Sequence, residues 1–252
     1  MERKLSLVLL PGLMCDDAFW RAQIDALGEI CVPRVMSYGR SDSIEAMAQH
    51  VLAEAPVTFA LAGHSMGGRV ALEICRRAPR RVAKLGLFCT DFRSPASEPA
   101  RDAEALDRHQ MLEVARTGGL KGFARMWIPR VIAPDRLGDA KLIAAITDMF
   151  CRQSYEMLEG QTHAGLTRPD YADDLSRIAC PTLICAGERD LLRSVEVHRQ
   201  MASRIKGSRL AVIPRSGHMV AMEQPRALND AMRRWLVDCE AVQPRAIARA
   251  LP

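Results

Sequence analysis

Residues 57–77 read VTFALAGHSMGGRVALEICRR, and this stretch decides the fold. A run of strand-forming residues stops at Gly63, Ser65 follows, and a helix-like stretch begins at once with Met66. In such a G-x-S-x-G pattern the serine occupies a strained turn that lifts its hydroxyl above the carboxyl edge of a sheet. Glycines at positions 63 and 67 leave room for this turn. The pattern therefore predicts that Ser65 is a nucleophile.

On both sides of this turn, short apolar runs alternate with amphipathic segments of helix length. This alternation is typical of a parallel sheet wrapped by helices, whose buried strands read as continuous Val, Ile and Leu runs. We therefore expect an α/β fold with a mostly parallel sheet of about six strands, flanked by helices. The predicted strands are residues 5–10, 31–36, 57–63, 85–89, 182–186 and 210–213. The predicted helices are residues 17–27, 43–55, 66–77, 195–205 and 225–237.

One long interval breaks the alternation of strands and helices. After the strand that ends near Cys89, residues 93–170 contain no strand pattern and are rich in Arg, Met and Ala. We predict a helical cap over residues 93–170, inserted into a core made of residues 1–92 and 171–252. The alternative is a longer helical crossover between two strands.

A serine hydroxyl is a poor nucleophile without a base, and the base must itself be oriented. Asp190 and His218 each follow a predicted strand, and the carboxyl ends of parallel strands share one edge. Ser65, Asp190 and His218 are therefore expected to converge, in the order Ser, acid, His. Two alternatives concern the acid: Asp190 only caps the helix that follows, or Asp91 at the same edge takes its role.

Acyl transfer also needs N–H donors for the developing oxyanion, and loss of one donor costs on the order of 10²–10³ in rate. One expected donor is the backbone N–H of Met66, directly after the nucleophile. The other is the N–H of Leu13, in the loop after the first strand. Gly12 permits the turn that brings this amide inward. Bulk at Gly12 should therefore not be tolerated, whereas changes of the Leu13 side chain should be.

Three apolar side chains are candidates for an acyl pocket: Met14, Trp127 and Met219. Clusters of this kind belong more often to the core than to a pocket. Among the histidines, His64 is expected to point toward the sheet, and His198 is expected at the surface.

The composition excludes several classes of function. The formal charge of +5 comes from scattered Arg rather than a basic run, so no nucleic-acid binding is expected. A preference for anionic substrates stays open, although a solvated surface explains most of these arginines. The eight cysteines have no zinc-site spacing, and no metalloprotease, P-loop or dinucleotide motif occurs. We therefore expect no metal and no cofactor.

The first fifteen residues superficially resemble a bacterial export signal. Their apolar run covers only Leu5–Leu10 and is broken by Pro11 and Gly12, so it reads better as a strand. No stretch approaches the ~18 apolar residues of a membrane span. The prediction is a cytoplasmic protein with reduced thiols and no membrane partner.

The motifs LVLLPGL with Trp20, AGHSMGG, PTLICAGERD and IPRSGHMVAMEQP resemble those of the α/β-hydrolase superfamily. The resemblance covers Leu5 to about Val237, and extends to small-cap microbial carboxylesterases, lactonases and carbon–carbon bond hydrolases. It implies a cofactor-independent serine hydrolase. Two features depart from the family: Pro11-Gly12 replaces the His-Gly of many members, and the sheet begins at the family's third strand.

The resemblance also implies that residues 161–170 close the cap, with Arg168 and Asp170 as a structural pair. For the function it implies cleavage of a carboxylic ester or related acyl bond in a small molecule. The same triad also serves carbon–carbon cleavage, lactone hydrolysis and perhydrolysis, and fold alone does not choose among them. A non-catalytic binding or sensor protein is a third possibility, but such a protein has no need of three triad residues.

Overall fold

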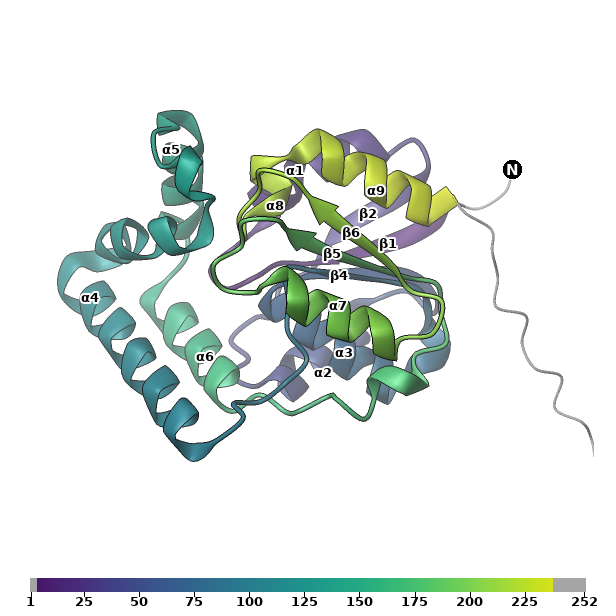
Figure 1. Cartoon of the computed structure of the whole chain (residues 1–252), viewed down its shortest axis with the longest axis horizontal. Coiled ribbons are helices and arrows are strands. Elements are labelled where there is room, and N and C mark those ends of the chain that lie inside the picture. The colour runs from purple at the N-terminus through teal and green to yellow at the C-terminus, as the bar shows by residue number, and fades with distance from the viewer. Residues whose placement is uncertain (1–3, 238–252) are drawn as a thin grey trace, which may run out of the picture.

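The computed structural model describes residues 4–237 and contains a six-stranded parallel sheet in the order β2-β1-β3-β4-β5-β6 (Figure 1). The strands are β1 (Leu5–Leu10), β2 (Cys31–Val35), β3 (Phe59–His64), β4 (Val82–Phe88), β5 (Thr182–Gly187) and β6 (Arg209–Ile213). The predicted α/β fold class is confirmed. Residues 238–252, assigned to the core in our prediction, lie outside the described residues.

The register of the sheet aligns the carboxyl ends of its strands. Leu10 pairs with Gly63, His64 with Phe88, and Gly187 with Ile213. The chain leaves β1 toward one side of the sheet for β2, and then returns to β3 and continues toward the other side. The carboxyl ends of β1 and β3 therefore form a topological switch point, where open α/β sheets bind their ligands.

Helices cover both faces of the sheet, α1, α8 and α9 on one and α2, α3 and α7 on the other (Figure 1). Their bounds are α1 (Asp17–Leu27), α2 (Ile44–Glu54), α3 (Met66–Arg77), α7 (Val195–Arg204), α8 (Val220–Glu223) and α9 (Pro225–Val237). Several begin at a capping side chain: Asp16 accepts from the N–H of Ala18, and Ser43 from that of Ala46. Each face of the sheet has its own apolar cluster.

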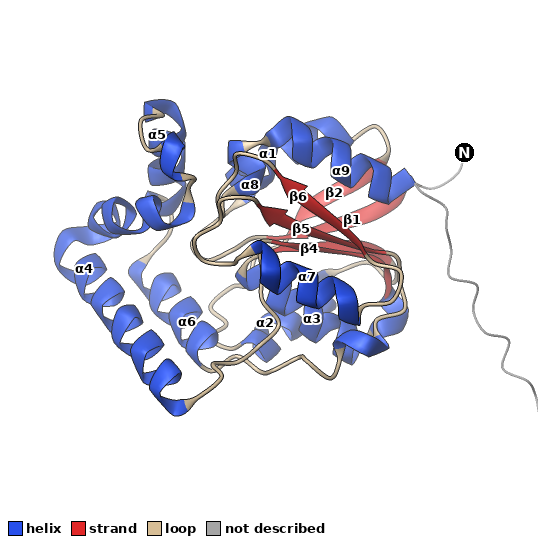
Figure 2. Cartoon of the chain, viewed as in Figure 1, coloured by secondary structure: helices blue, strands red, loops and turns tan. Residues whose placement is uncertain are grey.

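Between β4 and β5 the chain forms helices and no strand, as predicted. They are α4 (Glu98–Val131), α5 (Ala140–Cys151) and α6 (Tyr155–Leu166), and they lie beyond the arrowheads of the strands (Figure 2). The α4 helix is kinked at Gly119, whose φ of 63° and ψ of −175° are not helical. Phe123 and Phe150 pack with ring centroids 5.2 Å apart, and both belong to the apolar cluster that also contains α1.

The α4 helix has 34 residues but is not apolar, and no helix within residues 4–237 is both long and apolar enough to cross a membrane. We refer to α4, α5 and α6 together as the helical layer. This layer covers the sheet edge at which the strand-end loops meet.

Candidate active site

Ser65 lies in a strained turn between β3 and α3. Its φ of 53° and ψ of −114° are rare for a residue with a side chain, and such strain is typical of functional sites. Its N–H donates to the carbonyl oxygen of Phe88 at 2.9 Å, and the Thr90 hydroxyl donates to its carbonyl oxygen at 2.6 Å. A Cβ on Gly67 would lie 2.4 Å from the carbonyl oxygen of Leu10. The turn therefore fits against the end of β1 only because residue 67 is glycine.

Three strand-end loops bring Ser65, His218 and Asp190 into one hydrogen-bonded line. The distance from His218 Nε2 to Ser65 Oγ is 2.8 Å, and the distance from His218 Nδ1 to Asp190 Oδ2 is also 2.8 Å. Because Nδ1 faces a carboxylate, we assign the ring proton to Nδ1. Nε2 is then an acceptor for the Ser65 hydroxyl.

Asp190 uses its two oxygens differently. Oδ2 contacts His218, and Oδ1 accepts from the N–H groups of Leu192 and Arg193 at 2.8 and 2.9 Å. Burial favours a raised pKa for Asp190, but the charge and hydrogen bond of His218 and the two N–H groups lower the pKa below its usual value. The alternative that Asp190 only caps the following segment therefore accounts for Oδ1 but not for Oδ2. Asp91, the rival acid, binds the N–H groups of the two residues that follow it.

The two predicted oxyanion donors lie beside Ser65. Met66 is the first residue of α3, so its N–H has no partner within the helix. Leu13 lines the same pocket as Ser65, and its N–H makes no hydrogen bond to any residue within 4–237. The next N–H, of Met14, donates to Oε1 of Gln161 on α6 at 2.8 Å. Gln161 thus holds the loop that carries Leu13, a contact that the sequence did not predict.

A pocket lies above Ser65, and Leu13 and His218 are among the residues that line it. Of the three side chains predicted for an acyl pocket, Trp127 and Met219 line it. Met14 does not: its side chain is fully buried in the apolar core.

His64, next to Ser65, supports the backbone of His218. The ring stacks on Phe19 at 4.1 Å, and Nε2 lies 2.9 Å from the carbonyl oxygen of His218. Burial and the nearby His218 lower the pKa of His64 to about 3, so the ring is neutral. Because Nε2 faces a carbonyl, we assign its proton there. His64 therefore does more than pack on the sheet, because it also hydrogen-bonds to the backbone of His218.

Besides Met14, two further expectations about single residues were wrong. His198 is fully buried instead of exposed, because α7 packs on the sheet and both ring nitrogens have partners, Ser194 and Thr90. Arg168 pairs with Glu104 at 2.7 Å rather than with Asp170, since α4 runs beside the end of α6. Neither pairing follows from spacing in the sequence.

We expect Gly12→Ala to lower kcat on the order of a hundredfold, the effect of displacing a reacting group by about 1 Å. An added Cβ would lie 2.7 Å from His64 Nδ1 and 3.3 Å from the Cβ of Ser65. Close approach rather than a left-handed backbone explains this glycine, since its φ is not positive. Steady-state kinetics measure the loss, with Gly138→Ala as control because its Cβ would meet no atom within 4 Å. Unchanged kcat in Gly12→Ala would contradict this account.

Glu223 fixes the loop that carries His218. Its carboxylate accepts from the N–H of Gly217 at 3.0 Å and from that of Ala133 at 2.8 Å. The side chain is buried, and burial raises the pKa of Glu223. It therefore ties the loop that carries His218 to the end of α4.

Glu223→Ala should lower the free energy of unfolding by about 1–3 kcal/mol for each of the two buried N–H groups left without an acceptor. Urea denaturation measures the change. Glu223→Gln keeps one acceptor oxygen and should lose less than the alanine variant. Equal stability of wild type and Glu223→Ala would show that these hydrogen bonds contribute nothing net.

Within residues 4–237, one group of three side chains has ligand atoms close enough for a metal, Cys89, Asp190 and His218, within 4.8 Å of one another. Burial raises the pKa of Cys89, so its thiol keeps its proton. Asp190 and His218 are hydrogen-bonded to each other. This donor set suits proton transfer better than metal binding.

The chain was compared with known proteins. The model of the alpha/beta hydrolase family matches residues 7–231. The chain is 28% identical to the pimeloyl-[acyl-carrier protein] methyl ester esterase of Aromatoleum aromaticum, over 87% of this chain and 93% of that protein. It is 29% identical to the (E)-2-((N-methylformamido)methylene)succinate hydrolase of Acinetobacter baylyi, over 91% and 89%.

Among solved structures, a thermophilic esterase from Thermogutta terrifontis with malate bound superposes with a TM-score of 0.81. The identity is 29%, and the match covers 93% of this chain and 90% of that one. The chain therefore belongs to the alpha/beta hydrolase family, and it is a hydrolase of that fold.

Proposed function

We propose that this protein is a serine hydrolase that cleaves a carboxylic ester or related acyl bond through an acyl-enzyme. The observation that carries the proposal is the continuous line from Asp190 through His218 to Ser65, with 2.8 Å at each contact. Nucleophile, base and orienting acid are the minimum set for activating a serine.

In the first half of the reaction, His218 Nε2 takes the proton of Ser65 as Oγ attacks the ester carbonyl. Asp190 accepts a hydrogen bond from Nδ1–H and stabilises the imidazolium. The lowered pKa of Asp190 keeps its carboxylate ionised, as this role requires. The N–H groups of Met66 and Leu13 receive the oxyanion. His218 then returns the proton to the leaving alkoxide.

In the second half, water replaces the alcohol and attacks the acyl-enzyme. His218 takes a proton from this water, and the collapse of the second tetrahedral species releases the acid and restores Ser65. Trp127 and Met219 give the acyl group an apolar wall.

Two relatives support ester chemistry over the alternatives on the same triad. One carries the name of a methyl ester esterase, and the solved neighbour at 29% identity is described as an esterase. The relative named as a succinate-derivative hydrolase has similar identity. We therefore place carbon–carbon cleavage, lactone hydrolysis and perhydrolysis behind ester hydrolysis.

Labelling with a fluorophosphonate, followed by mass spectrometry of the peptides, tests the nucleophile directly. We expect one adduct, on Ser65, because among residues 4–237 only this hydroxyl combines a histidine nitrogen at 2.8 Å with a strained backbone. Ser65→Ala protein is the control and should remain unlabelled. An adduct on another residue, or none on folded protein, would overturn the proposal.

A further inference from the structure

Three arginine side chains line the same pocket as Ser65, and they come from separate parts of the chain. Arg69 lies on α3, one helical turn after Ser65, a rise of about 6 Å. Arg108 lies on α4, and Arg193 lies in the loop after β5. Among the described residues that line the pocket, Glu104 is the only carboxylate. One wall of the pocket is therefore cationic.

Arg69 has no hydrogen-bonding partner for most of its guanidinium group. Its side chain is 8% exposed, and its Nε and Nη2 atoms are buried without a partner in the described part of the chain. The nearest carboxylate oxygen, Oδ2 of Asp91, lies 3.8 Å from Nη2, too far for a hydrogen bond. A buried guanidinium is costly unless its donors are hydrogen-bonded, so these unpartnered donors point to a site for an anionic group.

The other two arginines share the acids around them. Oε1 of Glu104 lies 3.9 Å from Arg108, but both oxygens of Glu104 bind Arg168, at 2.9 and 2.7 Å. Arg193 Nε lies 3.7 Å from Oδ2 of Asp91. Four guanidinium groups therefore share two carboxylates around this part of the pocket, and positive charge is in excess.

Positive charges surround Arg69. Burial, followed by the positive charges of Arg193 and Arg168, lowers the pKa of Arg69. A negative ligand would relieve this repulsion. The buried hydroxyl of Thr162, also without a partner in the described chain, lines the same pocket and offers one more donor. The planar fork of a guanidinium matches a carboxylate with two parallel hydrogen bonds.

We propose that the substrate carries a second, ionised carboxyl group, which Arg69 binds together with Arg108 and Arg193 while the ester carbonyl lies at Ser65. The inference rests on the proposed ester hydrolysis and names its substrate class, the monoesters of dicarboxylic acids. Water cleaves the acyl–oxygen bond of such an ester, and the products are a dicarboxylate, an alcohol and a proton.

Matched pairs of esters test the proposal. One member is the monomethyl ester of a linear dicarboxylic acid, from malonic to suberic acid, and the other is its isostere with an isopropyl group in place of the carboxylate. We expect the wild type to prefer the charged member of the best pair by at least about tenfold in kcat/KM, the value of a charge-assisted hydrogen bond. Equal kcat/KM within every pair would overturn the proposal.

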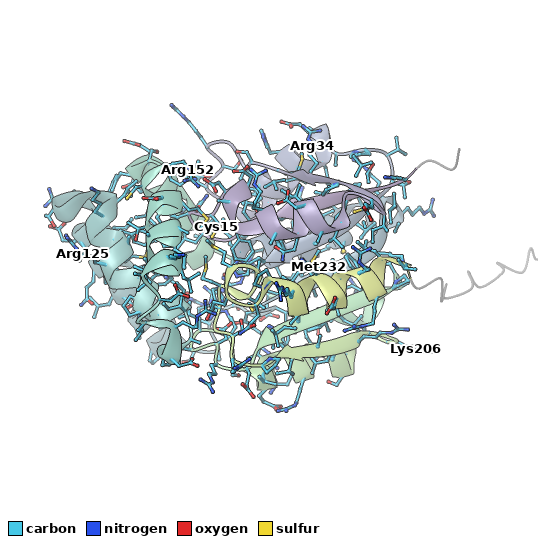
Figure 3. All side chains as sticks on the ribbon, turned by 90° about the horizontal axis from the view of Figure 1, so that it is seen from above. Cys15, Arg34, Arg125, Arg152, Lys206 and Met232 are labelled. Atoms are coloured by element: carbon cyan, nitrogen blue, oxygen red, sulfur yellow. The ribbon has the colours of Figure 1, made fainter. Side chains whose placement is uncertain are left out.

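Variants test whether this preference comes from the cationic wall formed by Arg69, Arg108 and Arg193. Arg69→Met should lower the ratio of kcat/KM between the two members of the best pair by at least about tenfold. Arg125→Gln is the control, because Arg125 is exposed at the outer edge of the helical layer (Figure 3). Its ratio should equal that of the wild type. An unchanged ratio in Arg69→Met would contradict the assignment.

Two further measurements keep the test decisive. If Arg69→Met does not fold, Arg193→Gln replaces a side chain that is 21% exposed, and it too must lower the ratio. Calorimetric titration of the free dicarboxylates tests binding without turnover. Binding at least about tenfold weaker in the variant supports the cationic site. If no ester is hydrolysed, the hydrolase proposal fails, while absence of dicarboxylate binding would overturn the present inference separately.

Discussion

Ser65→Ala is expected to lower kcat on the order of 10⁶-fold for any ester that the wild type hydrolyses, the loss known for removal of a triad serine. In the proposed mechanism the side chain supplies the atom that forms the acyl bond, and no other hydroxyl within the described residues contacts His218 Nε2. Steady-state turnover of a short-chain p-nitrophenyl ester measures the loss. Residual activity above solution hydrolysis is expected, because the oxyanion donors and the pocket remain.

The folded state of Ser65→Ala should be close to that of the wild type, since the Ser65 side chain makes no capping hydrogen bond to α3. Thermal melting provides this control. Substantial turnover by a folded, pure Ser65→Ala protein would remove the acyl-enzyme mechanism. Loss of folding would instead show that the strained turn depends on the hydroxyl.

Asp190→Asn is expected to lower kcat by about 10⁴-fold, because an amide can present its N–H to the imidazole and stabilise the wrong tautomer. The native carboxylate accepts a hydrogen bond from the Nδ1–H of His218, with 2.8 Å between Nδ1 and Oδ2, and its other oxygen accepts from two backbone N–H groups. Asn keeps the size of the side chain, so KM should change less than kcat. The measurement is kcat and KM on the same ester.

Asp173→Asn is the matched control for this substitution, because Asp173 is exposed near the start of β5. Its kcat should equal that of the wild type. A comparable loss in Asp91→Asn, together with full activity in Asp190→Asn, would transfer the role of the acid to Asp91.

Much of the sheet could be predicted because local patterns and burial agree. The apolar run of β1 ends at Pro11, and α1 begins after the capping Asp16, so both elements have the predicted bounds. The start of β4 was predicted three residues too late, at Leu85. The strand begins at Val82, but Lys84 interrupts the apolar run, and both Ala83 and Lys84 are only partly buried.

Within the helical layer, the sequence predicts helix but not its course. Gly119 interrupts the helical geometry through its positive φ, yet the chain is helical on both sides of it. Pro129 lies inside the last turn of α4 without ending the helix at once. Turn residues fix local dihedral angles only, and packing decides the direction of the next segment.

Site residues could be predicted from the sequence where each follows a strand, because the strand ends share one edge of the sheet. Residues that act through contacts between distant segments could not. Ser65, Asp190 and His218 follow from strand ends at a shared edge. The contacts of Gln161 and Glu223 join segments far apart in the sequence, so no spacing reveals them. Arg69 had a usable signal, a charge within the buried stretch MGGRVALEIC, because such charges are rare unless paired.

The hydrogen bond between Gln161 and the N–H of Met14 limits how this enzyme can be re-engineered. The helical layer, which lines part of the pocket, also supplies an acceptor to the loop beside Ser65. A chimera that carries another enzyme's helices on this sheet would keep its nucleophile but release that loop, unless glutamine is retained at the equivalent position. Replacing the helical layer is thus expected to change the position of this loop, and with it the reaction rate, as well as the shape of the pocket.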